Sequence, residues 1–368
     1  DHGDRDIALR FDLTVPFARF AAQHVPTLGT PFKRYHMGPV WRGENTAHGR
    51  YREFWQCDFD TIGTTSNSSD IEAALVINAL LAAIGFERFE IHVNNRLILS
   101  GLLEELGLAD KSVAVLRALD KLPKIGIEPV VEEMVLHGVD AEKGRKVLEL
   151  AGFKGSNEEI LAFVSQKFGN NPKAAEGVKR LSELLIVARE SGVPDERLRI
   201  DLSIARGLDY YTGTTFEFVH ELLGAQSGIG GGGRYDGLME QLGGQSLSGI
   251  GFGLGVDRAL LAAQAEGVLV ENQFSSDLFI IPLGESQKSA SLSIATKLRS
   301  AGIRTEIAFG DRALKGAMKA ADKSGSRYVI VLGDSELASG SVELKRMSDG
   351  STTSVKIDQL QSVLLGDL

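Results

Sequence analysis

A block of helix-forming sequence inside a strand-rich chain constrains the fold more than any other feature. From about residue 97 to 193, Leu, Glu, Lys and Ala dominate with the spacing of amphipathic helices. On both sides of it, short segments alternate polar and apolar residues, the period of a strand with one face against a core. We therefore expect a helical module inserted between two segments that build a sheet.

The segment before the block is rich in aromatic residues and arginines. Phe32–Tyr35 and Val40–Arg42 are expected to be two short strands. Arg52–Asp60 alternates polar and apolar side chains over most of its length, so one face would pack on a core and the other would line a site. Asp70 is expected to cap a helix over Ile71–Ile84, because aspartate is a preferred N-cap residue.

Glycines concentrate after the helical block, from Gly224 to Gly255, in a chain that holds 42 glycines. Gly228–Gly233 matches G-x-G-x-x-G, but no apolar strand precedes it and no clear helix start follows, so dinucleotide binding is not indicated. A polar stretch over Val268–Ser276 is a predicted linker. From Asp277 onward strands and helices alternate, which predicts a small, mostly parallel α/β domain with a terminal hairpin.

Composition excludes several classes of protein. A net charge of −9 argues against nucleic-acid binding by bulk charge, although it leaves room for a local basic patch. The single cysteine, Cys57, excludes intramolecular disulfides and cysteine-cluster zinc sites and fits a reducing cytosol. The longest apolar run, Ala73–Phe86, is too short to cross a bilayer, so no membrane partner is expected.

A local basic patch is predicted in the last domain. Residues 277–368 hold 12 lysines and arginines against 11 acidic residues, a near-neutral balance in an acidic chain. Four of these basic residues share one predicted helix face, which suits an RNA backbone and equally suits a solvated surface. They are Arg312, Lys315, Lys319 and Lys323.

Three arginine-bearing segments indicate an anion site. Arg42–Arg52 surrounds a hairpin-like loop, Arg206–Tyr211 follows a predicted strand, and Gly251–Arg258 ends at a helix start. The guanidinium fork matches phosphate oxygens, so arginines on strands and at a helix N-terminus suit a polyphosphate. Taken singly, each segment is better explained by surface arginines that pair with carboxylates, and it is the three segments together that favour an anion site.

At these segments the sequence resembles the histidyl-tRNA synthetases, a family of class II aminoacyl-tRNA synthetases. Gly49–Asp60 resembles motif 2 and Gly251–Arg258 resembles motif 3. Arg206–Tyr211 and Gly232–Leu238 resemble the two histidine-specific signatures, and Leu9–Thr14 resembles the segment that holds the amino group of the amino acid. The resemblance covers essentially the whole chain, and the paired histidine signatures are its most specific part.

The resemblance implies an α+β fold: a class II synthetase-like mixed, mainly antiparallel sheet with a helical insertion and a C-terminal α/β domain. Residues 1–96 and 194–272 would form the catalytic domain, 97–193 the helical insertion domain, and 277–368 the anticodon-binding domain. Motif 1, which builds the family's dimer interface, would precede residue 1, so the chain is expected to lack its natural N-terminus. The full-length protein would be a cytoplasmic homodimer.

The implied reaction joins histidine to ATP, with Mg²⁺ on the outer phosphates, and then passes the histidyl group to tRNA(His). Arg42 and Arg206 would flank the α-phosphate as catalytic residues, and no metal ligand is assigned among the side chains. The other ATP-binding residues would be Glu44, Arg50, Phe54 and Arg258. The histidine-binding residues would be Asp12, Thr14, Gln56, Asp60, Tyr211 and Tyr235. Many bacterial members carry the longer glutamate at the positions of Asp12 and Asp60.

Two other functions remain open from the sequence. The regulatory subunit of ATP phosphoribosyltransferase resembles the synthetase catalytic domain, but it lacks the C-terminal domain. An RNA-binding or scaffolding protein derived from a synthetase is the third possibility. Neither would catalyse histidine-dependent exchange between ATP and pyrophosphate, which an active synthetase would.

Overall fold

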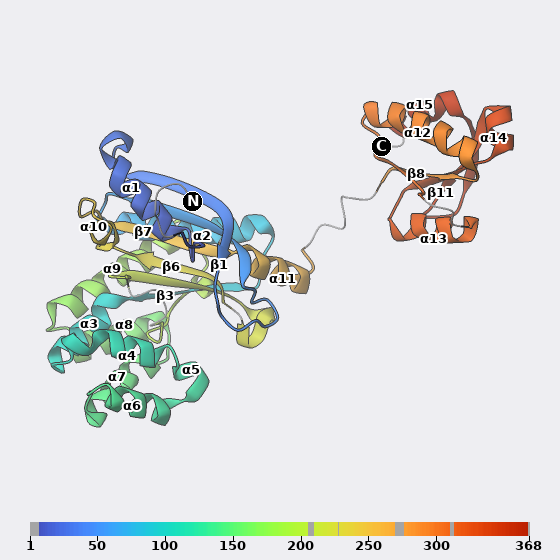
Figure 1. Cartoon of the computed structure of the whole chain (residues 1–368). Coiled ribbons are helices and arrows are strands. Elements are labelled where there is room, and N and C mark those ends of the chain that lie inside the picture. Colours follow the sequence, from blue (N-terminus) through green and yellow to red (C-terminus); the bar gives the residue numbers. More distant parts are fainter. Residues whose placement is uncertain (1–6, 205–209, 227, 269–275, 310–312, 367–368) are drawn as a thin grey trace. The chain divides into compact units, whose positions relative to one another are not determined.

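The structure, a computed structural model, describes residues 7–204, 210–226, 228–268, 276–309 and 313–366. The chain divides into two compact units, residues 1–269 and residues 270–368, each held together by contacts within itself (Figure 1). Each unit has its own sheet and its own buried core.

Within the described residues of the first unit, seven strands form one sheet in the order β1-β2-β7-β6-β5-β3-β4. β3 and β4 run parallel, and the other neighbouring pairs are antiparallel. The predicted mixed, mainly antiparallel sheet of an α+β fold is confirmed. The strands are β1 (Phe32–Trp41), β2 (Glu53–Ile62), β3 (Phe89–Asn95), β4 (Leu198–Ile200), β5 (Thr214–His220), β6 (Gly228–Arg234) and β7 (Gly249–Gly255).

β1 is one continuous strand, where the sequence predicted two short ones. Its residues pair with β2 without interruption from Phe32 opposite Ile62 to Trp41 opposite Glu53. Pro39 lies inside β1, which is an edge strand and therefore pairs with a neighbour on one side only. Proline has no backbone N–H, and on the unpaired side of an edge strand no such donor is needed. The even-numbered residues of β2 from Phe54 therefore share one face of the sheet.

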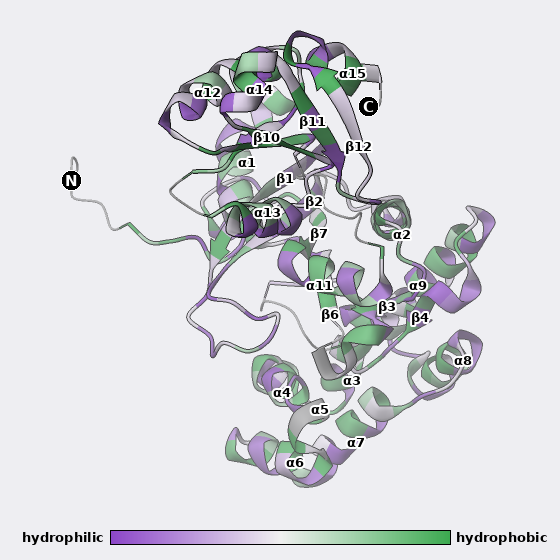
Figure 2. Cartoon of the chain, turned by 90° about the vertical axis from the view of Figure 1, so that its right-hand side faces the viewer, coloured by the Kyte–Doolittle hydropathy of each residue, from purple (hydrophilic) through white to green (hydrophobic). Residues whose placement is uncertain are grey.

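The helices of the first unit include a run from α3 to α9 that corresponds to the helix-forming block (Figure 1). Hydrophilic and hydrophobic stretches alternate along α4, α6 and α7, as expected of amphipathic helices (Figure 2). The helices are α1 (Thr14–Leu28), α2 (Asn67–Ile84), α3 (Arg96–Glu105), α4 (Ser112–Leu119), α5 (Leu122–Ile125), α6 (Ile127–Leu136), α7 (Ala141–Gly152), α8 (Asn157–Phe168), α9 (Pro172–Glu190), α10 (Leu238–Gln241) and α11 (Val256–Glu266).

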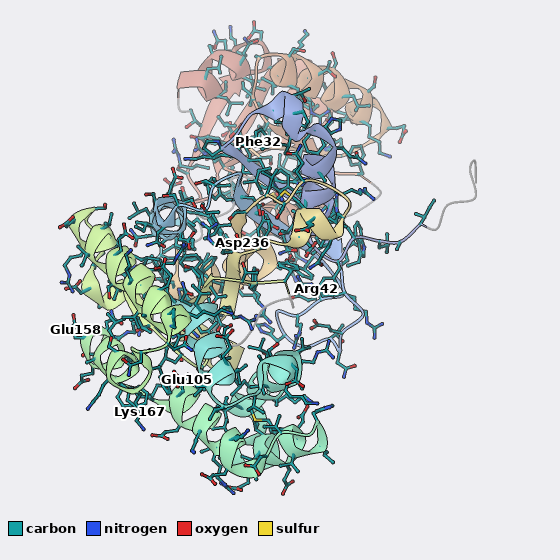
Figure 3. All side chains as sticks on the ribbon, turned by 90° about the vertical axis from the view of Figure 1, so that its left-hand side faces the viewer. Phe32, Arg42, Glu105, Glu158, Lys167 and Asp236 are labelled. Carbon is teal, nitrogen blue, oxygen red and sulfur yellow. The ribbon has the colours of Figure 1, made fainter. Side chains whose placement is uncertain are left out.

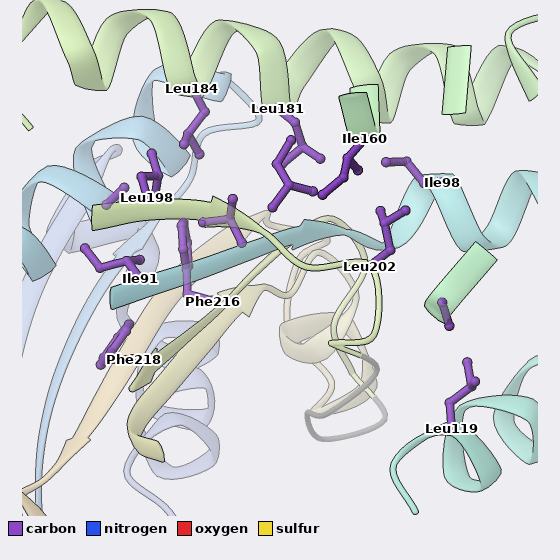
Figure 4. Close-up of a cluster of buried hydrophobic side chains, with 14 of the residues drawn as sticks. Ile91, Ile98, Leu119, Ile160, Leu181, Leu184, Leu198, Leu202, Phe216 and Phe218 are labelled. Carbon is purple, nitrogen blue, oxygen red and sulfur yellow. The ribbon is translucent and has the colours of Figure 1, made fainter. Parts of the chain in front are cut away.

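One hydrophobic core joins these helices to the sheet. Leu181 and Leu184 of α9 belong to the same buried cluster as Ile91 of β3 and Leu198 of β4, and Figure 4 shows them facing one another. The helices thus pack directly on the sheet through a shared core. A division into domains at residues 97 and 193 rests on composition and stays a prediction.

Helix α2 begins earlier than the sequence predicted. Its N-cap is Ser66, whose side chain accepts a hydrogen bond from the backbone N–H of Ser68, and it ends at Gly85 in the left-handed conformation. Asp70 is therefore not the cap: it lies fully buried in the first turn, where it pairs with Arg234. The helix is long and apolar enough to cross a membrane by length and composition, but five of its apolar residues are buried in the core, namely Ile71, Ala73, Ala74, Ile77 and Leu81.

The second unit holds a five-stranded sheet among its described residues, in the order β12-β11-β10-β8-β9. β8, β9 and β10 are parallel as predicted, and β11 and β12 add an antiparallel hairpin. β10 is coloured hydrophobic along its length in Figure 2, which fits a central buried strand. The elements are β8 (Leu278–Pro282), α12 (Glu285–Ser300), β9 (Thr305–Ile307), α13 (Leu314–Lys323), β10 (Tyr328–Leu332), α14 (Asp334–Ser339), β11 (Ser341–Arg346), β12 (Thr352–Lys356) and α15 (Leu360–Gly366).

Candidate functional site

A cavity of about 310 Å³ opens over β2, β7 and β6 in the first unit. The segment before α1, the loop between β1 and β2, and the start of α11 supply its walls. Ten of the residues predicted from the sequence line it, together with several glycines. The ten are Asp12, Thr14, Arg42, Glu44, Arg50, Phe54, Gln56, Tyr211, Tyr235 and Arg258.

Glycines form the floor of this cavity. Gly253 of β7 lies between Asp58 of β2 and Gly231 of β6, and Gly231 lies opposite Glu217 of β5. A Cβ at Gly253 would approach Asp58 Oδ1 to 2.7 Å, and one at Gly231 would approach the Phe216 carbonyl oxygen to 2.9 Å. Asp58 and Glu217 are thus three strand spacings apart, about 14 Å, and only glycines lie between them. This leaves room on the sheet for an extended ligand.

One end of the cavity carries arginines. The Arg42 guanidinium lies 4.5 Å from the ring centre of Phe11 and 5.0 Å from that of Phe54, and its Nε donates to the Phe11 carbonyl oxygen at 3.2 Å. Arg42 is labelled in Figure 3. Arg258 Nε donates to the Gly49 carbonyl oxygen at 3.1 Å, which ties α11 to the loop between β1 and β2. These contacts fix two guanidinium groups along the cavity wall.

The loop between β1 and β2 carries a third arginine, Arg50, which forms an ion pair with Glu44. Both side chains are partly exposed, at 48% and 39%. An exposed pair of this kind contributes little stability, so both groups remain accessible to a ligand.

Acidic side chains gather at the other end. Asp12 accepts hydrogen bonds from the Val15 backbone N–H at 3.0 Å and from the Tyr210 hydroxyl at 3.3 Å. Asp58 lines the cavity and is 3% exposed, and its Oδ1 has no hydrogen-bond partner among the residues that the structure describes. Gln56 Oε1, on the same strand face, is likewise buried without a partner in the described part of the chain.

Asp60 lies on the same face of β2 as Asp58 but does not line the cavity. Its Oδ1 accepts a hydrogen bond from the Tyr235 hydroxyl at 2.6 Å, and its Oδ2 lies 2.8 Å from Arg34 Nη2 in an ion pair that lacks the alignment of a hydrogen bond. Arg34 also donates to the Leu13 carbonyl oxygen at 3.0 Å. Asp60 thus turns toward Tyr235 and Arg34, and of these two aspartates of β2 it is Asp58 that lines the cavity.

Burial governs the ionisation of these acids. Burial, and then the neighbouring Asp60 carboxylate, raise the pKa of Asp58 to about 8, while Arg34 and Arg42 act in the opposite direction. Burial raises the pKa of Asp60 to about 6, although Arg34 and the Tyr235 hydroxyl lower it. Burial and Asp60 also raise the pKa of Tyr211, so its hydroxyl stays protonated and available as a donor.

Several lining residues escaped the sequence analysis. Asp58 follows Gln56 by two positions, so the alternation of Arg52–Asp60 already placed it on the site face. Glu217 and Asp257 carried no such signal, since they reach the cavity through the register of β5 and through the start of α11. The Asp257 Oδ2 accepts a hydrogen bond from the Trp55 backbone N–H at 2.9 Å.

The remaining predicted residues lie away from this cavity or outside the described residues. Arg206 and Arg312 fall outside the described residues. Lys315, Lys319 and Lys323 are exposed on α13 of the second unit. The described residues contain no group of three or more histidine, cysteine or acidic side chains placed to hold a metal ion.

Comparison with known proteins identifies close relatives. The family model described as "Histidyl-tRNA synthetase" matches residues 1–259, and the model described as "Anticodon binding domain" matches residues 277–366. A protein of Rhodopirellula baltica named histidine--tRNA ligase is 50% identical over 349 residues, which cover 95% of this chain and 79% of the relative. One of Wolinella succinogenes with the same name is 41% identical over 370 residues, or 100% and 84% of the two chains.

Among solved structures, the histidyl-tRNA synthetase from Nostoc sp. PCC 7120 superposes with a TM-score of 0.76 at 30% sequence identity. The match covers 100% of this chain and 86% of that one. The agreement therefore extends over both units and over all the segments that line the cavity.

Proposed function

This chain belongs to the histidyl-tRNA synthetase family, and on that premise we infer that it activates histidine with ATP and transfers the histidyl group to tRNA(His). In the first step the histidine carboxylate attacks the α-phosphorus of ATP, which gives histidyl-adenylate and pyrophosphate. In the second step a hydroxyl of the terminal ribose of the tRNA takes the histidyl group and AMP leaves.

The observation that carries this proposal is the division of charge along one cavity. Arg42 and Arg258 line it together with Asp12 and Asp58, over a floor of glycines. A zwitterionic amino acid and a polyphosphate need this arrangement, because the ammonium seeks carboxylates while the two reacting anions seek fixed positive charge. Attack of one anion on another is slow unless guanidinium groups neutralise the phosphate in the transition state.

For the ATP end we propose the roles that the family resemblance implies. Phe54 stacks on adenine, Glu44 accepts a hydrogen bond from the adenine amino group, and Arg50 and Arg258 meet the γ-phosphate. Arg42 and Arg206 flank the α-phosphate. The stacking of Arg42 on Phe54 at 5.0 Å supports a flat binding surface there.

The site fits a Mg²⁺ ion that is bound mainly by the phosphates of ATP. The described residues build no cage of three ligands for a metal, and Mg²⁺ binds ATP mainly through phosphate oxygens and water, with one or two carboxylates. Glu217 lies beside Arg258, since a Cβ at Gly228 would be 2.9 Å from Glu217 Oε1 and 4.0 Å from Arg258 Nη1. When bound, the ion neutralises the outer phosphates, and Glu217 is the cavity carboxylate placed to hold one of its waters.

For the histidine end we propose that Asp12, Thr14 and Gln56 hold the α-ammonium, while Asp60 and Tyr211 recognise the imidazole with Tyr235 closing the pocket. A buried ring nitrogen without a partner would cost about 1–3 kcal/mol, so both nitrogens need polar partners. Asp60 itself does not line the cavity, so we propose that it takes this role through the hydrogen bond that it accepts from Tyr235.

The partners and assembly are proposals of the same kind. The full-length protein forms a homodimer in the cytoplasm, since isologous dimers are the commonest assemblies and the family builds its interface from motif 1. Residues 1–96 and 194–272 act as the catalytic domain, with 97–193 as the helical insertion. The second unit binds the anticodon of the tRNA, which its match to the anticodon-binding family supports.

The decisive experiment is histidine-dependent exchange of label between pyrophosphate and ATP, with each of the other standard amino acids as controls. Exchange with histidine alone supports the proposal, and absence of exchange with every amino acid supports a regulatory or scaffolding protein. Arg206→Ala should lower exchange by about 10²–10³-fold at saturating substrates, and Arg206→Lys should restore little of it, because lysine lacks the two-pronged geometry.

A charge reversal on α13 tests the division of labour between the units. Changing Lys315, Lys319 and Lys323 to Glu should weaken tRNA binding and reduce its dependence on salt, because fewer counterions are released. Exchange without tRNA should be unchanged. If aminoacylation stays normal while exchange is lost, the assignment of the two units is wrong.

A further inference from the structure

Asp58 is a buried acid of the cavity that the family roles above leave without a function. It is 3% exposed, it lines the cavity, and its Oδ1 has no hydrogen-bond partner among the described residues. A buried carboxylate oxygen without a hydrogen-bond partner is costly, so a group that supplies donors and positive charge would be held tightly against it.

The place of Asp58 shows which part of a ligand it would meet. A Cβ at Gly253 would lie 2.7 Å from Asp58 Oδ1 and 2.8 Å from Gln56 Nε2, so the ends of both side chains converge over this one glycine. Gln56 Oε1 is also without a partner among the described residues. Asp12 faces the same cavity from the segment before α1.

These three side chains suit an ammonium group. An ammonium has three N–H donors and a full positive charge, and the site offers the Asp12 carboxylate, Gln56 Oε1 and Asp58 Oδ1 as acceptors. A neutral imidazole has one N–H and no charge, so it could not donate to both Asp12 and Asp58 or balance their negative charge.

We propose that Asp58 is a further substrate-binding residue of this enzyme, which accepts a hydrogen bond from the α-ammonium of bound histidine and balances its charge. The inference rests on the proposed function and deepens its amino-acid subsite.

Ligand binding then changes the ionisation of Asp58. The groups that face it are Asp60 on its own strand, Asp12 before α1, Arg34 on β1, Arg42 after β1 and Tyr211 before β5. Without ligand, burial and the two other carboxylates favour the protonated form, consistent with a pKa of about 8. An arriving ammonium favours the carboxylate form, so near pH 7 a cation enters and a proton leaves.

The test compares two ligands that differ by the ammonium alone. Histidine and 3-(imidazol-4-yl)propionate share the ring and the carboxylate, and the second lacks the ammonium. Their dissociation constants are measured by calorimetry on wild type and on Asp58→Asn. The variant should bind histidine about 10–100-fold more weakly and bind the analogue within about twofold of wild type. Asp140→Asn is the matched control, because this exposed N-cap of α7 keeps its capping oxygen.

Proton release gives a second readout. Histidine binding near pH 7, measured in buffers of different ionisation enthalpy, should release close to one proton from wild type and none from Asp58→Asn. Equal weakening of both ligands, no weakening of either, or unchanged proton release in the variant would each overturn the assignment. Histidine-dependent exchange by wild type is measured beside these assays, so a failure of the proposed function is distinguished from a failure of Asp58's role.

Discussion

Two arginines of the first unit meet buried aspartates in opposite ways. Arg234 uses all three guanidinium nitrogens: Nε donates to Asp70 at 3.0 Å, Nη1 to the Thr64 carbonyl oxygen at 3.0 Å and Nη2 to Ser69 at 2.8 Å. Arg34 reaches Asp60 through Nη2, but its Nε and Nη1 are buried without hydrogen-bond partners among the described residues.

The difference separates a structural pair from a site. Arg234 belongs to Gly232–Leu238, which resembles one of the two histidine-specific signatures, yet it does not line the cavity described above. Its contacts tie the end of β6 to the first turn of α2. Arg34 supports a group of acids that together exceed its single charge. A saturated network stabilises the fold, whereas an unsaturated one keeps affinity for a ligand that completes it.

The largest expected effect comes from breaking the saturated pair. Arg234→Met should lower the free energy of unfolding by about 3–5 kcal/mol, because it leaves Asp70 buried without a cation. Urea unfolding followed by tryptophan fluorescence measures it, since both tryptophans, Trp41 and Trp55, lie on β1 and β2 and report on the first unit.

Arg145→Met provides the control for that change. Arg145 forms a two-pronged pair with Glu128 at 2.7 and 2.8 Å, but both side chains are more than half exposed. Solvent screens such a pair, so its loss should change the unfolding midpoint little. Similar losses in the two variants would show that burial does not separate the pairs.

The contrast between these regions also marks how far the sequence predicts the structure. Alternation in Arg52–Asp60 correctly placed one face of β2 at a site, because the period of a strand is local information. Asp70 was assigned to a helix cap because its true partner, Arg234, lies 164 residues away. Asp58 was missed because its importance depends on the register that places Gly253 beside it. Long-range pairing, and not local propensity, decides both cases.

A second prediction concerns the unsaturated pair. Arg34→Leu removes the cation beside Asp60, whose pKa is already raised to about 6, so this acid can take up a proton instead of remaining charged. The loss of stability should therefore be smaller than for Arg234→Met, about 2 kcal/mol at pH 8. Without Arg34 the pKa of Asp60 rises further, so the variant pays for the charged carboxylate over a wider pH range than the wild type. The difference in stability between the two proteins should therefore be small at pH 5 and grow between pH 6 and 8. A loss that is independent of pH would contradict the account.

A third prediction has the opposite sign. Without ligand, Asp58→Asn should increase the stability of the protein, because the wild-type carboxyl has a folded pKa of about 8 against an ordinary value of 3.8. The free energy of unfolding of the wild type therefore falls as pH rises from about 4 to 8, whereas asparagine does not titrate and causes no such fall. The gain should be near zero at pH 4 and should increase steadily toward pH 9, because the folded and unfolded pKa values of Asp58 lie in that range. Saturating histidine should reverse the order, because the wild type alone binds it tightly; an unchanged order would contradict this role.

The smallest loss of stability is expected on removing the hydroxyl of Tyr235, which follows Arg234 in the sequence and donates to Asp60. Its hydroxyl donates to Asp60 at 2.6 Å and its ring is 1% exposed, so Tyr235→Phe keeps the packing and removes one donor. Asp60 then loses a bond that lowers its pKa, and the cost should be about 1 kcal/mol at pH 8, less at pH 5. Tyr210→Phe is the matched control, since its hydroxyl bond to Asp12 is longer at 3.3 Å and should cost less. Equal costs at both pH values would mean that the Tyr235 hydroxyl does not affect the ionisation of Asp60, which would contradict the prediction.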